Sequence, residues 1–216
     1  MTRTETLIRY RRLRQISNEH HHAVLNIIAP EVLLDWAKRL GLTQGRRVVL
    51  ENEHELTLAK DLATYLPRLG SSPPLDRYAR AARFAPGSDA AIVLEAMRRA
   101  RFSVWRVERR HETAGLVLRD LLRDEEIQLV DETMEKAVAM GVEMAGRVLT
   151  PEGFAITARI VVPVTPELME QVFVRGAPAL RSAKGDVLAR DPRFAIGIYR
   201  AAVATGAMDS VRLQRR

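Results

Sequence analysis

The chain has 216 residues, of which 47% are hydrophobic and 5% aromatic, so it can bury a core built mainly from aliphatic side chains. The absence of cysteine excludes disulfides, thiolate metal sites and cysteine nucleophiles. The net charge of +7 favours a polyanionic partner. Because no signal peptide or membrane-length apolar run is present, we expect a soluble, cytoplasmic protein with no membrane partner and no cofactor.

The charge is distributed unevenly along the chain. Residues 119–173 hold five basic and eleven acidic residues, whereas the segments on either side of them are basic. Most of the basic residues are arginines, which suit bidentate contacts with phosphate or carboxylate groups.

Residues 1–68 have the apolar spacing of a helical region. The pattern predicts helices over residues 5–28, 31–40 and 53–66. Pro30 stands where the second helix begins, and Gly41 is a suitable end for it. Residues 46–51 fit either a short strand or the start of the third helix.

Residues 69–87 are expected to form a linker. Residues 69–75 read LGSSPPL, a run of Gly, Ser and Pro that opposes regular structure, and residues 76–83 fit a helical turn. Ser88 or Asp89 then begins a helix that continues to about Arg101.

Residues 88–164 are expected to form a β-rich module with that helix at its start. Five short apolar segments separated by turn residues follow one another: FSVWRVER, GLVLRDLL, EEIQLVDE, EMAGRVLT and FAITARIVVPV. Residues 133–141 are compatible with one helical turn. This spacing predicts a small antiparallel β meander or a barrel-like sheet.

Residues 165–216 are expected to form helices that pack on the core. Thr165 and Pro166 are a strong helix start, and Asp191 begins a last helix that Gly206 ends. Residues 175–185 read as a loop or a broken helix. The fold class is therefore α+β, with a helical N-terminal part, a β module and C-terminal helices.

Three arginine clusters suggest a phosphate-binding surface, and the third of them consists of Arg212, Arg215 and Arg216. Nearby aromatic residues could stack on bases. The candidate nucleic-acid-binding residues are Arg9, Arg11, Arg12, Arg14, Arg98, Arg99, Arg101, Trp105, Arg106, Arg109 and Arg110. The aromatic set also includes Tyr10 and Phe102. The leading hypothesis is a non-enzymatic binding protein for nucleic acid or a ribonucleoprotein complex. In the alternative, these arginines pair with acids of the same chain.

Two further groups of residues invite a chemical role. Asp120 and Asp131 each follow an apolar strand segment, and a pair of carboxylates can bind Mg²⁺ in a hydrolase. The competing interpretation is that they are ordinary strand-end residues. His20, His21 and His22 are consecutive, so they point in three directions on a helix, and we expect hydrogen-bonded surface histidines rather than a metal site.

The sequence lacks the GxxxxGK[ST], GxGxxG, Gly-x-Ser-x-Gly and HExxH motifs of common enzyme classes. The second functional hypothesis is a protein-interaction module. In this module the acidic hairpin of one copy meets basic helices of another copy in a homo-oligomer.

The segment FSVWRVERRHETAGLVLRDLLRDEEIQLVDE, together with the later AGRVLTPEGF, resembles a segment of uncharacterised bacterial proteins, some of which carry a SecA-like C-terminal metal motif. The resemblance covers residues 102–164 and implies a compact β module. This chain has no cysteine, so the metal motif is absent and the resemblance assigns no site residues.

Overall fold

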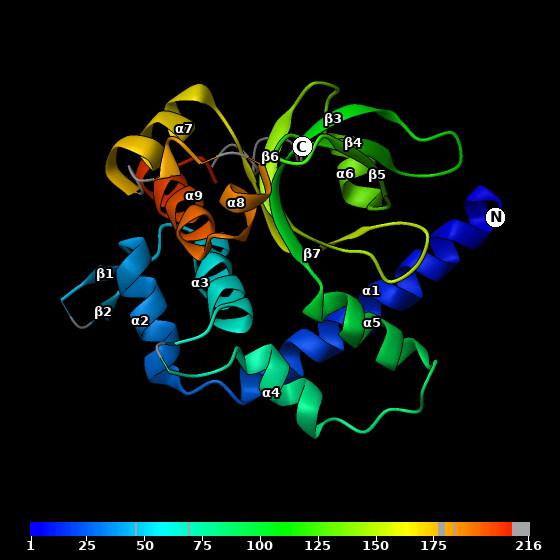
Figure 1. Cartoon of the computed structure of the whole chain (residues 1–216), viewed down its shortest axis with the longest axis horizontal. Helices are drawn as coiled ribbons and strands as arrows, with labels where there is room; N and C mark the ends of the chain where they lie inside the picture. The colour runs from blue at the N-terminus through cyan, green and yellow to red at the C-terminus, as the bar shows by residue number, and fades with distance from the viewer. Residues whose placement is uncertain (46, 69, 177–179, 184, 209–216) are drawn as a thin grey trace.

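The structure is a computed structural model that describes residues 1–45, 47–68, 70–176, 180–183 and 185–208. Helices from both ends of the chain pack against an antiparallel sheet, so the α+β prediction is confirmed (Figure 1). The helices are α1 (Arg3–Asn26), α2 (Pro30–Leu40), α3 (Glu53–Tyr65), α4 (Pro74–Ala81), α5 (Asp89–Arg98), α6 (Glu132–Ala137), α7 (Pro166–Gln171), the π-helix η1 (Val172–Gly176), α8 (Gly185–Arg190) and α9 (Pro192–Thr205). The strands are β1 (Thr43–Gln44), β2 (Arg47–Val48), β3 (Arg101–Arg110), β4 (Leu116–Asp120), β5 (Glu125–Leu129), β6 (Glu143–Leu149) and β7 (Ile156–Pro163). None of the helices described is long and apolar enough to cross a membrane.

Local sequence signals set most of the helix ends. Gly41 ends α2 in the left-handed conformation, with φ of 84°, as predicted. The side chains of Ser88, Thr165 and Asp191 accept hydrogen bonds from backbone N–H groups in the first turns of α5, α7 and α9. These predicted helix starts are therefore confirmed.

The five-stranded sheet has the order β5-β4-β3-β6-β7, and every neighbouring pair is antiparallel. Strands β3, β4 and β5 form the expected meander, but β6 pairs with the other edge of β3 instead of with β5. The meander is therefore limited to β3, β4 and β5, because the ten-residue strand β3 has a partner along each edge.

The sheet curls until its two edges meet. Leu129 and Ala155 form a parallel bridge, and the Val130 N–H donates to the Ala155 carbonyl at 2.8 Å. The enclosed side holds a small apolar cluster around Trp105 and Leu118, and Met134 of α6 packs against it. This closure gives the sheet the predicted barrel-like form.

The outer face of the sheet packs against the helices. Phe102 and Ile160 belong to the same apolar cluster as Leu13 of α1, Leu62 of α3 and Phe194 of α9. Helices α1 and α5 lie along one flank of the sheet, while α3 and α9 lie beside each other at the other flank (Figure 1). The N-terminal, central and C-terminal regions thus share one core.

Much of the expected linker is helical. Helix α4 begins at Pro74, where proline suits the first helical turn, and Leu75 is buried in the shared core. The prediction that residues 69–75 lack regular structure is therefore wrong at its C-terminal end. The segment at 47–48 is a short strand, α6 lies in the ambiguous segment 133–141, and α8 was not foreseen.

Candidate functional site: an arginine pocket

A pocket of about 460 Å³ lies between the start of β3, the β4–β5 turn, β6 and α8. Its lining, which we call the arginine pocket, consists of Ala100, Arg101, Phe102, Arg123, Glu125, Arg147, Asp186, Ala189 and Arg190. Four arginines from four different elements therefore face one space, although they are far apart in the sequence.

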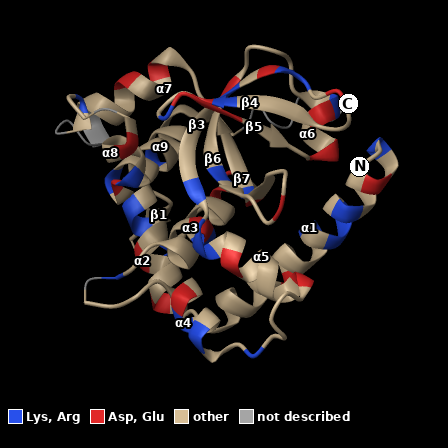
Figure 2. Cartoon of the chain, turned by 45° about the vertical axis from the view of Figure 1, so that its right-hand side comes forward, with Lys and Arg blue, Asp and Glu red and all other residues tan. Residues whose placement is uncertain are grey.

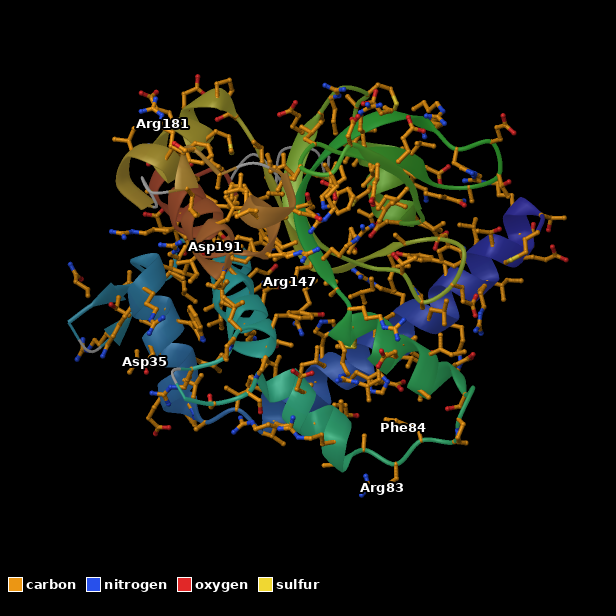
Figure 3. All side chains as sticks on the ribbon, viewed as in Figure 1. Asp35, Arg83, Phe84, Arg147, Arg181 and Asp191 are labelled. Carbon is orange, nitrogen blue, oxygen red and sulfur yellow. The ribbon has the colours of Figure 1, made fainter. Side chains whose placement is uncertain are left out.

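Arg147 forms the inner wall of the arginine pocket. It lies where the sheet meets α3 and α9 (Figure 3), and only 7% of the residue is exposed. Its Nε donates to the Oδ2 atom of Asp61 on α3 at 3.0 Å, and the Tyr199 hydroxyl donates to the same oxygen at 3.1 Å. Burial is the largest single influence and lowers the pKa of Arg147, but Asp61, Tyr199 and Tyr65 together outweigh it and the pKa is raised.

One edge of the Arg147 guanidinium has an N–H donor without an acceptor among the described residues. Its Nη2 atom is buried and has no hydrogen-bond partner among the described residues. Its carbon Cζ lies 4.7 Å from the ring centre of Tyr65 and 5.4 Å from that of Phe102, so the group contacts two aromatic rings. The group is thus fixed in orientation with an unused N–H edge.

Arg123 is held just as firmly in the β4–β5 turn. Its Nη1 donates to Asp120 Oδ2 at 2.9 Å, and the other oxygen of Asp120 accepts from Ser103 Oγ at 2.5 Å and from the backbone N–H of Leu122. Asp120 is fully buried. This network fixes the turn and places Arg123 in the wall of the pocket.

Helix α8 closes the outer side of the pocket. Asp186 pairs with Arg123 at 2.7 Å and with Arg190 at 3.3 Å, and Glu125 pairs with Arg101 at 2.8 Å. Unlike Asp61 and Asp120, both of these carboxylates are 54% exposed. Asp186 and Glu125 are therefore more exposed to solvent than the inner acids, and solvent screening weakens their ion pairs.

Additional positive charge lies behind Arg147. Arg159 on β7 has a buried Nε atom without a partner in the described structure, and burial lowers its pKa. Arg14 of α1 donates to the carbonyls of Thr157 and Ala158 in the same region. The Asp61 carboxylate acts on both Arg147 and Arg159, so these two guanidinium groups share its negative charge.

The family of unknown function DUF7986 matches residues 4–179, which is most of the chain. The protein belongs to DUF7986. No curated protein and no solved structure matches it. In this DUF7986 chain the matched residues include Arg101, Arg123 and Arg147, whereas α8 lies beyond them.

The candidate arginines of the DUF7986 chain have partners within the chain. Those paired with carboxylates are Arg9, Arg11, Arg12, Arg98, Arg99, Arg101, Arg106 and Arg109. Arg14 and Arg110 donate to backbone carbonyls. Basic and acidic residues alternate along the ribbon in Figure 2. Arg212, Arg215 and Arg216 lie outside the described residues.

The aromatic residues expected to stack on bases are buried. Trp105 is 1% exposed, and its indole N–H donates to the Gly146 carbonyl at 3.1 Å inside the curled sheet. Phe102 and Tyr10 are buried in the shared core. The apolar area of these side chains is used in packing, so this geometry gives no support to a stacking role for them.

The two candidate metal carboxylates are structural. Asp120 holds the β4–β5 turn, and Asp131 caps α6 by accepting from the Thr133 and Met134 N–H groups and from the Thr157 hydroxyl. The described residues contain no group of three or more His, Asp or Glu side chains placed to hold a metal ion. A hydrolase site at Asp120 and Asp131 has no support in this geometry.

Two of the three histidines are buried, so the expectation of three surface histidines is wrong. Because α1 packs on α3, α4 and α5, His20 contacts the Tyr78 hydroxyl at 3.0 Å, and His21 Nε2 contacts the Tyr65 hydroxyl at 3.0 Å. His21 Nδ1 also lies 2.7 Å from the Ser17 carbonyl. The histidines are hydrogen-bonded, as predicted, but inside the protein; His22 is exposed.

His21 should make the protein sensitive to mild acid. Burial, with Arg159 adding to it, lowers the pKa of His21 from 6.5 to about 3, so below about pH 6.5 the unfolded state binds the extra proton. The free energy of unfolding should therefore fall by about 1 kcal/mol per pH unit between about pH 6 and 4.5. Urea titrations at several pH values measure this slope. His21→Gln should reduce it, whereas the exposed control His22→Gln should not; equal slopes in all three proteins would contradict this assignment.

The sequence reasoning missed Asp61, Arg123, Arg147, Asp186 and Arg190. The available signal was a charge at a core position: Arg147 interrupts the apolar run EMAGRVL, and Asp61 lies beside Leu58 and Leu62 on the buried side of α3. A lone charge at such a position usually has a buried partner.

Proposed function

We propose that the protein binds an anionic small molecule in the arginine pocket. The observation that carries this proposal is Arg147, which lines the pocket with three further arginines and whose buried Nη2 atom has no hydrogen-bond partner among the described residues. The volume of 460 Å³ is within the range of small-ligand sites.

Energetics support the same ligand class. A buried donor without a partner costs about 1–3 kcal/mol, and an anion that accepts its hydrogen bond removes that cost. Asp61 and the two aromatic rings fix the Arg147 guanidinium before any ligand arrives, so little side-chain entropy is lost on binding.

Thermal unfolding with inorganic phosphate tests the proposal. At constant ionic strength, about 1–10 mM phosphate should raise the Tm of the wild type above its value in chloride. Arg190→Ala should reduce this increase, because Arg190 lines the pocket and is 78% exposed, so its loss spares the core. Arg109→Ala is the matched control, since Arg109 is 59% exposed and forms one ion pair with Glu126 elsewhere. An equal phosphate effect in all three proteins would sink the proposal.

Binding of nucleic acid is the alternative proposal, and the net charge of +7 is its support. The ion pairs and carbonyl contacts of the candidate arginines leave fewer guanidinium groups to neutralise phosphates. Neutralised phosphates give a steep dependence of affinity on salt. A fluorescence titration with single-stranded and duplex DNA across a salt series therefore decides it, and flat, weak binding would count against it.

A further inference from the structure

Carboxylates at the outer side of the arginine pocket already pair with arginines that an anionic ligand would bind. The Oδ1 atom of Asp186 lies 2.7 Å from Arg123 Nε, and its Oδ2 atom lies 3.3 Å from Arg190 Nη2. One carboxylate thus engages two arginines of the arginine pocket, much as an anionic ligand would.

These outer acids differ from those behind the pocket. Asp120 accepts four hydrogen bonds while fully buried, and Asp61 holds both Arg147 and Tyr199, so neither can move without breaking the core. Asp186 and Glu125 are half exposed and can turn into solvent. An incoming anion can therefore replace the outer acids and leave the inner acids in place.

Helix α8 itself need not move during this exchange. Gly185 has φ of +50°, and a Cβ atom there would lie 2.9 Å from the Leu122 carbonyl, so the start of α8 lies directly against the β4–β5 turn. Leu188 of the same helix is buried in the core. Rotation of the Asp186 side chain is enough to release Arg123 and Arg190.

We propose that the arginine pocket binds a phosphate monoester, whose phosphoryl oxygens displace the Asp186 carboxylate from Arg123 and Arg190. This inference rests on the proposed function and names its ligand class. A carboxylate offers two oxygens in one plane and suits one guanidinium fork, whereas a phosphoryl group offers three acceptor oxygens to guanidinium groups from several directions. The volume of 460 Å³ leaves room for an organic group beside the phosphate.

Isothermal titration calorimetry with phenyl phosphate tests this inference. Asp186→Asn should bind phenyl phosphate about five times more tightly than the wild type, because the competing charge is gone. Glu95→Gln is the matched control, because Glu95 also pairs with two arginines, Arg98 and Arg99, but outside the pocket. The affinity of this variant for phenyl phosphate should equal the wild-type value. Dimethyl phosphate, a singly charged diester, should bind at least about ten times more weakly.

The outcomes separate the two proposals. Weaker or unchanged binding by Asp186→Asn, or equal affinity for the diester, overturns the inference even if inorganic phosphate still binds at the pocket. If neither inorganic phosphate nor phenyl phosphate binds, the proposed function fails as well. Should Asp186→Asn fail to fold, Glu125→Gln takes its place, since it releases Arg101 on the same side of the pocket and should also tighten binding.

Phosphate monoesters occur on small metabolites and on the ends of nucleic acids, and the same titration distinguishes these sources. Tighter binding of ribose 5-phosphate than of a 5′-phosphorylated oligonucleotide supports a metabolite. The reverse order, with no binding of the unphosphorylated oligonucleotide, supports a nucleic-acid end. If the oligonucleotide binds equally well without its phosphate, recognition of the monoester is refuted.

Discussion

Asp61→Asn should lower the free energy of unfolding by about 3 kcal/mol or more, measured by urea denaturation. Asp61 is 1% exposed, and its carboxylate compensates the buried charge of Arg147 at 3.0 Å. The amide of asparagine keeps the shape of the side chain but removes that compensation, and it leaves a buried cation without a counter-charge.

Asp35→Asn is the matched control for this change. Asp35 (labelled in Figure 3) pairs with Arg68 at the same distance of 3.0 Å, but both side chains are about half exposed. The expected loss in the free energy of unfolding is therefore about 0–1 kcal/mol. The double variant Asp61→Asn, Arg147→Met should recover part of the loss, because it removes the stranded cation. Equal losses in the free energy of unfolding for Asp61→Asn and Asp35→Asn would show that burial does not raise the energetic cost of breaking the Arg147–Asp61 pair.

Gly115→Ala should have the second large effect, a loss of about 4 kcal/mol in the free energy of unfolding. Gly115 has φ of +81°, and a Cβ atom there would lie 2.0 Å from the Leu129 carbonyl oxygen. Because that oxygen belongs to the backbone where β5 ends, the clash is relieved only by moving β4 away from β5, next to the bridge that closes the sheet.

Gly41→Ala separates the clash from backbone strain. Gly41 has φ of +84°, nearly the same as Gly115, but no atom would lie within 4 Å of its added Cβ. Only the left-handed strain of about 1–2 kcal/mol applies there. Similar urea midpoints for the two variants would mean that β4 and β5 adapt to the methyl group, and the described packing at Leu129 would be wrong.

The helix ends and the five strand segments were predictable because their causes are local. Gly41 and Asp191 act within one turn of the helices that they bound. The strand order was not predictable from such signals, because the pairing of β6 with β3 depends on contacts between distant segments. The start of α4 was predicted two residues too late because two prolines suggested a linker, although Pro74 stands in the first helical turn, which tolerates proline.

The candidate site was almost invisible in the sequence for the same reason. Arg147 and Asp61 are 86 positions apart, and neither belongs to a motif. The visible arginine clusters drew attention to the surface, where most of those side chains have partners. Arg101 is the candidate residue that the structure also places in the arginine pocket. A buried pair of charges requires a three-dimensional structure to be recognised.

The most direct test of the anion-binding proposal is a ¹H–¹⁵N spectrum of the arginine guanidinium groups during a titration with phenyl phosphate. The Arg147 resonances should be resolved, because the group is buried and paired with Asp61, and they should shift to saturation at the same ligand concentration as those of Arg123. Unchanged Arg147 resonances, with linear and unsaturated shifts of exposed arginines such as Arg99, would contradict an anion site at the arginine pocket.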